Sequence, residues 1–183
     1  MEQKEPIEFI FDGRKTIQAA GILVANDRVI SRKRLLKLLY IADREALKEV
    51  GRPISGDRLV ALPQGPVLSN FYNMMKKPDA EMSEFFQSSG IYLKLIKDPD
   101  VDELNRFEIK KLNEIAERFK DSDADDLSEL THTFPEWIKH NPGTSSETIP
   151  IEDILQAMDA ADQIEFVRNN AKQSKGVEEL WGK

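Results

Sequence analysis

The stretch Arg32–Val50, with the sequence RKRLLKLLYIADREALKEV, determines the fold of this chain. Its apolar positions recur at intervals of three or four residues, namely Leu35, Leu39, Ala42, Ala46 and Val50. This spacing places them on one face of an α-helix. Ser31 is a favourable N-cap for that helix, and Gly51, with Pro53 just beyond it, ends the pattern. The sequence therefore predicts a long amphipathic helix, the strongest element of the chain.

Asp43 places a carboxylate on or beside the apolar stripe of this helix. It follows Leu39 by four residues and precedes Leu47 by four. A carboxylate buried without a partner is destabilising by several kcal/mol, so we expect Asp43 to be bound by an arginine, a histidine or backbone donors. Two interpretations stay open, because structural networks resemble active sites: Asp43 secures the fold, or it belongs to a functional site.

Shorter elements are expected on both sides of the central helix. Asp12 can cap a helix that runs to about Ala25. Leu59, Val60 and Leu62 favour a strand over 58–62, and the alternation over 91–96 predicts a second strand. Gly65-Pro66 is expected to make a strand-to-helix turn, with the helix running to about residue 75.

The second half of the chain is expected to be mostly helical. Helices are predicted over 104–119 and 127–130, with a turn over 136–139 and a last amphipathic helix over about 151–167. The predicted fold is therefore mainly α with a small antiparallel β-sheet (α+β). We expect one compact domain over residues 1–183, since this length suits a single core.

Composition excludes several kinds of chemistry. The chain has no cysteine, which excludes disulfides, thiolate nucleophiles and cysteine-based metal sites. His132 and His140 lack the spacing of a metal site, and no glycine-rich loop suits a phosphate, so we expect no metal and no cofactor. The first residues do not resemble a secretory signal, and no stretch is apolar enough for a membrane span. We therefore expect a cytoplasmic protein.

Charge is distributed unevenly along the sequence. Residues 98–129 hold twelve acids and five bases, which matches the net charge of −7 of the whole chain. This segment is either a solvated surface or a surface for a basic partner. The basic stretch at residues 28–37 suggests nucleic acid, or side-chain stems that cover apolar surface. The acidic total disfavours a nucleic-acid partner.

Four short motifs occur in a fixed order along the chain. They are Lys37–Asp43 (KLLYIAD), Gly51–Asp57 (GRPISGD), Gly65–Val67 (GPV), and Leu127–His132 (LSELTH) followed by Trp137. Together, in order and spacing, they resemble the Panacea (SocA-like) antitoxin domain over about residues 12–140. A helical extension over about residues 144–183 lies outside the motifs.

This resemblance implies a binding protein and not an enzyme. Members of the family are small bacterial and prophage-encoded proteins, usually encoded beside a toxin, and they neutralise that toxin by direct contact or by aiding its degradation. A cognate toxin is thus the implied partner, with a cellular protease added where degradation is the route, and no cofactor is implied. The resemblance identifies neither the toxin-contacting residues nor a homo-oligomer.

The matched positions define a candidate structural site. They are Leu39, Tyr40, Asp43, Arg44, Gly56, Asp57, Gly65, Pro66, Val67, Thr131, His132 and Trp137. We expect Gly56-Asp57 to form a tight turn. We also expect Asp43, Arg44, Thr131, His132 and Trp137 to form one polar and aromatic cluster.

Two other functions stay open at this point. Asp43 and His132 could act as an acid–base pair in a hydrolase or transferase, with Ser55 or Ser69 as the nucleophile. More weakly, the basic start of the central helix suggests a DNA-binding regulator.

Overall fold

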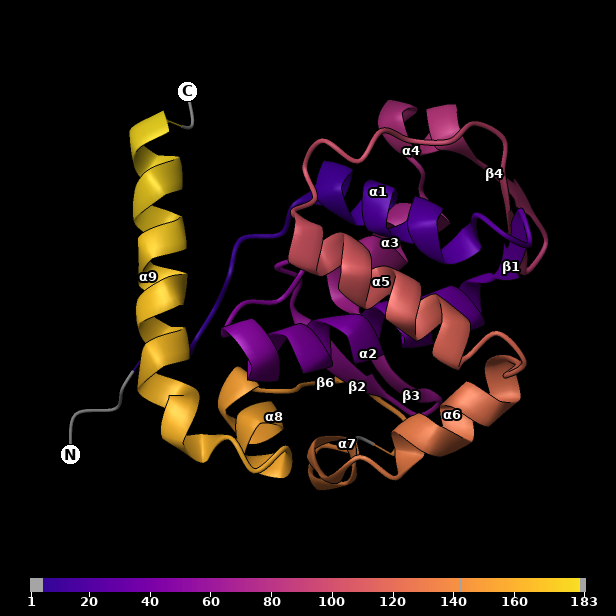
Figure 1. The fold of residues 1–183 in the computed structure, drawn as a ribbon. Helices are drawn as coiled ribbons and strands as arrows, with labels where there is room; N and C mark the ends of the chain where they lie inside the picture. Colours follow the sequence, from indigo (N-terminus) through magenta and orange to yellow (C-terminus); the bar gives the residue numbers. More distant parts are fainter. Residues whose placement is uncertain (1–4, 142, 182–183) are drawn as a thin grey trace.

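Helix α2 (Arg32–Val50) runs through the middle of the molecule, and the other helices pack around it (Figure 1). The structure is a computed structural model that describes residues 5–141 and 143–181. The Ser31 hydroxyl accepts the Arg34 N–H at the start of α2, and Gly51 ends the helix at a left-handed φ of 68°. Both bounds of the predicted central helix are confirmed.

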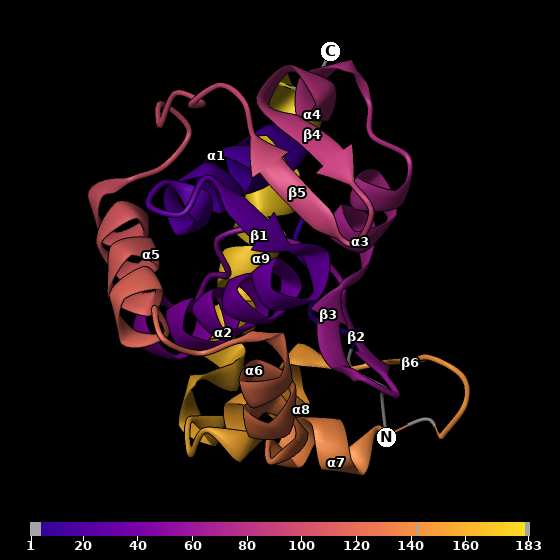
Figure 2. The same cartoon turned by 90° about the vertical axis from the view of Figure 1, so that its right-hand side faces the viewer.

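Two groups of helices cover α2. Helices α1 (Gly13–Val24) and α5 (Arg106–Arg118) pack against each other and against α2. Helices α6 (Ala124–His132) and α8 (Ile151–Ala157) pack on another side of α2. Figure 2 shows α2 between the two groups. The core between them is apolar and closed to solvent, so each large side chain there stabilises the fold by about 1.5–3 kcal/mol. Its fully buried members include Ile17, Leu35, Leu38, Leu47, Leu112, Ile115 and Ile154.

The strands form two small antiparallel sheets. One has the order β1 (Val29–Ser31), β5 (Tyr92–Leu95), β4 (Phe86–Ser89). The other has the order β3 (Gly65–Leu68), β2 (Leu59–Leu62), β6 (Glu147–Thr148). The mainly helical α+β class is confirmed, with antiparallel strands divided between two sheets.

The predicted helix start at Gly65-Pro66 was wrong. These residues begin strand β3, where Pro66 pairs with Ala61 and Gly65 with Leu62, and α3 (Ser69–Lys76) starts only afterwards. Proline lacks an N–H and is tolerated at the edge of a sheet, and β3 is an edge strand among the described residues. The dipeptide is thus compatible with a helix start and with an edge strand. Here its pairing with β2 makes it part of a strand.

The predicted last helix over 151–167 was also wrong, because the chain breaks in its middle. Helix α8 ends at Ala157, Asp159 takes a left-handed φ of 55°, and the Ala160 N–H returns to the Leu155 carbonyl at 2.8 Å. A 3-10 turn, η1 (Ala161–Gln163), leads into α9 (Ile164–Trp181). Helix α9 turns away and stands beside the body (Figure 1).

Other short elements were absent from the sequence predictions. They are β1, β4, β6 and α4 (Ala80–Phe85), while α7 (Pro135–Lys139) matches the predicted turn. Among the described residues, no helix is long and apolar enough to cross a membrane.

Candidate functional site

An open groove of about 1230 Å³ runs beside the N-terminal half of α2. One wall is the β1–β5 side of the first sheet, and another is the turn of the β2–β3 hairpin. The loop at the start of α6 closes a third side. Its lining includes both basic and apolar side chains, among them Arg32, Lys33, Arg34, Lys37, Leu36, Leu62, Tyr72, Ile91 and Tyr92.

Lys37 lies buried at the base of this groove. Its side chain is among the largest that are closed to solvent, and its Nζ donates to the Pro66 carbonyl at 2.9 Å. Burial, with a smaller contribution from Lys33, lowers the pKa of Lys37 to about 7. The amine therefore changes charge near neutral pH.

Gly65 leaves the space that the Lys37 amine occupies. A Cβ built on Gly65 would lie 2.5 Å from Lys37 Nζ and 2.9 Å from Thr131 Oγ1, and Gly65 has a φ of 100°. The left-handed backbone conformation favours glycine at this position, and a Cβ there would displace the amine.

The neighbouring basic side chains differ in how many partners they have within the fold. Lys33 pairs with Asp125 at 2.9 Å. Arg34 donates to the Ser122 carbonyl at 2.8 Å and to the Phe119 carbonyl at 2.9 Å, where it caps the end of α5. The buried Nε of Arg32, by contrast, has no hydrogen-bond partner in the described part of the chain.

Asp43 binds the loop that follows α2. Its carboxylate accepts the N–H groups of Ile54 at 2.8 Å and Ser55 at 3.0 Å, together with the Ser55 hydroxyl. Burial raises the pKa of Asp43 to about 6, although these three donors oppose the increase. Of the partners expected for Asp43, backbone donors are the ones present, and His132 is not among its partners within the described residues.

Tyr40 and Arg44 share a different partner, Glu136 of α7. Arg44 Nε donates to Glu136 at 2.6 Å, the Tyr40 hydroxyl donates to it at 3.1 Å, and the Arg44 guanidinium lies 4.1 Å from the Phe134 ring centre. Burial and the Glu136 carboxylate raise the pKa of Tyr40 well above its ordinary value. Glu136 and Phe134 were not predicted from the sequence; the only signal for Glu136 was that an arginine beside the buried face of α2 needs an acid.

His132 and Trp137 form a third group. Their rings stack with centres 4.1 Å apart, and Trp137 Nε1 donates to the Leu62 carbonyl at 3.0 Å. Thr131 donates to the Ser128 carbonyl at 3.2 Å. Because Asp43 lies in another network, the expected single cluster of five side chains is divided among separate networks.

The remaining motif residues have structural positions. Asp57 accepts the N–H groups of Asn70 and Phe71 at 2.9 Å each, which caps the start of α3. A Cβ on Gly56 would lie 2.0 Å from the Ile10 carbonyl oxygen. Leu39 and Val67 lie in the core. Within the described residues, no group of three or more histidine or acidic side chains could hold a metal ion.

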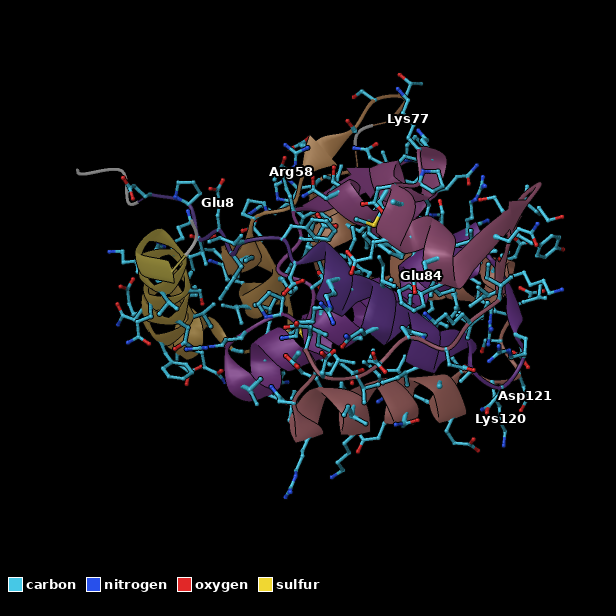
Figure 3. All side chains as sticks on the ribbon, turned by 90° about the horizontal axis from the view of Figure 1, so that it is seen from above. Glu8, Arg58, Lys77, Glu84, Lys120 and Asp121 are labelled. Carbon is cyan, nitrogen blue, oxygen red and sulfur yellow. The ribbon has the colours of Figure 1, made fainter. Side chains whose placement is uncertain are left out.

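The acidic segment 98–129 is used partly inside the fold. Glu108 accepts from Lys15 of α1 at 2.7 Å, and Asp102 accepts from Arg14 at 3.1 Å. Lys120 and Asp121, in contrast, are exposed beyond the end of α5 (Figure 3). The segment thus joins α5 to α1 and also forms a solvated surface.

Comparison with known proteins assigns the family. The family model for the SocA-like antitoxin, Panacea domain, matches residues 35–138, which is more than half of the chain. No curated protein matched the chain. No solved structure matched it either. The matched range begins in α2 and ends in α7, and it contains the groove base, the Asp43 network and the stacked His132. The chain therefore belongs to the SocA-like antitoxin family and carries its Panacea domain.

Proposed function

We propose that this chain is the antitoxin of a bacterial toxin–antitoxin pair and neutralises its cognate toxin by direct binding. The family match over residues 35–138 carries the proposal. The groove beside α2 supports it, because exposed apolar side chains and incompletely bound cations favour a protein partner. We place the pair in the cytoplasm, where a chain without cysteine fits a reducing compartment.

A binding role agrees better with the polar networks than a hydrolase or transferase does. A general base must reach a proton of the substrate, and a nucleophile must reach the reacting atom. Asp43 and Ser55 are each 1% exposed and bind one another, while His132 stacks on Trp137. These side chains are arranged to hold the fold together.

Co-expression with the protein encoded by the adjacent gene tests the function. We expect that protein to arrest growth when expressed alone, growth to recover when this chain is added, and the two proteins to elute together. Growth arrest without recovery, and without a complex, would contradict the proposal. The half-life of the toxin with and without this chain separates simple binding, which leaves it unchanged or longer, from delivery to a protease, which shortens it.

We further propose that the Panacea domain and the C-terminal extension form one folding unit. Strand β6 pairs with β2, Ile154 and Leu155 of α8 are fully buried, and Asn170 of α9 donates to the Gly51 carbonyl at 3.1 Å. Residues 182–183 of the predicted extension lie outside the described residues. A single calorimetric transition is expected, and two separate transitions would contradict it.

A further inference from the structure

We propose that the groove beside α2 is the toxin-binding site and that it takes an extended toxin segment in which an acidic side chain is flanked by apolar ones. This inference rests on the antitoxin function proposed above and adds the surface and the chemistry of the partner. Three observations carry it: basic groups in the groove that form no ion pair among the described residues, a buried amine beside a glycine, and an exposed apolar rim.

The first observation is that two basic groups of the groove, Lys37 and Arg32, form no ion pair among the described residues. Lys33 is neutralised by Asp125, and Arg34 is occupied with the carbonyls at the end of α5. Among the described residues, Lys37 has only the uncharged Pro66 carbonyl as its hydrogen-bond partner, and the buried Nε of Arg32 has none. A carboxylate supplied by the partner would give the basic side of the groove the counter-ion that the described residues do not provide.

The second observation is the placement of the Lys37 amine. Burying a lysine beside a neutral carbonyl destabilises a fold, since the charged form loses its hydration. The chain nevertheless keeps this amine at the base of the groove, next to a glycine whose Cβ would collide with it. Gly65 and Lys37 both line the groove, so a carboxylate bound there lies close to the amine of Lys37, which is itself 1% exposed.

The third observation is the apolar rim. Ile91, Tyr92 and Val29 line the groove although they are 67%, 48% and 45% exposed. The rim is joined to the cationic floor, because the Arg32 N–H donates to the Ile91 carbonyl at 2.9 Å and Ser31 pairs with Tyr92. Exposed apolar side chains with a tyrosine among them are typical of protein interfaces.

The size and the remaining charges of the groove favour a peptide segment over other occupants. Its volume of about 1230 Å³ exceeds the roughly 300–1,000 Å³ of ordinary small-molecule sites. Asp123 and Asp125 also line it; Asp125 is paired with Lys33, and Asp123 would repel a phosphate backbone that approaches in an extended path. A segment with one carboxylate between apolar residues places a single negative charge in the groove and leaves the rest of its length uncharged beside Asp123.

The test measures binding of the adjacent-gene protein to the full-length chain by titration calorimetry. Ile91→Asp and Tyr92→Asp each remove an apolar contact at the rim and add a carboxylate that competes with the toxin for the basic side chains of the groove. Each should raise Kd at least tenfold. Arg32→Ala should raise Kd about fivefold. Ile138→Asp is the matched control, because Ile138 is 60% exposed on α7, outside the groove, and the same charge is added; its Kd should stay within twofold.

The outcomes separate this inference from the proposed function. If the groove variants bind as tightly as the wild type, the groove is not the site, and the antitoxin function stands. If the wild type itself does not bind, the function fails and the inference fails with it. An array of overlapping toxin peptides should show binding to a peptide with an acid among apolar residues, and selection of a peptide without an acid would overturn the proposed chemistry. Tight binding of a labelled DNA duplex that Arg32→Ala abolishes would also overturn it.

Discussion

Ser55 donates its hydroxyl hydrogen to the Asp43 carboxylate in the protein interior, where each residue is 1% exposed. The same carboxylate accepts the N–H groups of Ile54 and Ser55. Two of the four family motifs therefore meet at one buried carboxylate, and the loop after α2 is held against the helix by it. These three donors stabilise the buried carboxylate, which has no cationic partner among the described residues.

Removal of the Asp43 carboxylate should destabilise the fold. Asp43→Ala leaves two buried N–H groups and a hydroxyl without an acceptor, so we expect the free energy of unfolding to fall by about 3 kcal/mol. Asp43→Asn keeps a carbonyl acceptor and should cost about 1 kcal/mol or less. Urea unfolding monitored by circular dichroism measures both, and the exposed Asp121→Ala serves as control. Equal losses in the alanine and asparagine variants would contradict this assignment.

The raised pKa of Asp43 predicts the sign of a pH effect. Its pKa is about 6 in the fold against 3.8 for the ordinary group, so between these values the folded state binds more protons than the unfolded state. Stability contributed by this group therefore decreases as the pH rises from about 4 to about 6. Asp43→Asn lacks this titrating group. Its free energy of unfolding should therefore increase relative to that of the wild type as the pH rises from about 4 to about 6. A difference independent of pH would show that Asp43 titrates normally.

His140 should give a pH effect of the opposite sign. Burial lowers its pKa, but hydrogen bonds to Asp153 at 2.5 Å and to Glu147 at 2.8 Å outweigh that and raise it above 6.5. Its stabilisation is thus complete below pH 6.5 and is lost as the pH rises through the folded pKa. We expect His140→Ala to cost about 1–2 kcal/mol at pH 5.5 and clearly less at pH 9. A loss that is the same at both pH values in urea unfolding would refute the paired imidazolium.

The elements that could be predicted from the sequence are those with local signals. The apolar spacing of α2 and its Ser31 and Gly51 ends depend on neighbouring residues alone, so both bounds were correct. Gly65-Pro66 suits a helix start and an edge strand equally, and its pairing with β2 is a tertiary fact. The break after α8 depends on Asp159 in a left-handed conformation, which no glycine marks.

The candidate site was less predictable because its contacts join distant parts of the chain. The need of Asp43 for donors followed from burial, but the donors come from residues 54 and 55 and not from His132. Glu136 lies 92 residues from Arg44. The groove itself lies where α2, the two sheets and the start of α6 come together, and no local sequence pattern predicts that these elements are neighbours.

Lys37 gives the prediction that separates stability from binding. Its pKa is about 7 in the fold against 10.5 for the ordinary group, so the unfolded state binds more protons between these values, and stability rises with pH across that interval. Lys37→Met fills a similar volume without an amine to desolvate and should raise the free energy of unfolding by about 1–2 kcal/mol at pH 7, and by less at pH 10.

The same variant should bind the toxin more weakly, because the groove has lost the amine that lies close to the bound carboxylate. Urea unfolding and calorimetric titration of one preparation measure both quantities. A variant that is less stable than the wild type would mean that the Pro66 hydrogen bond outweighs the desolvation of the amine, whereas a more stable variant with unchanged Kd would show that the amine does not contact the toxin.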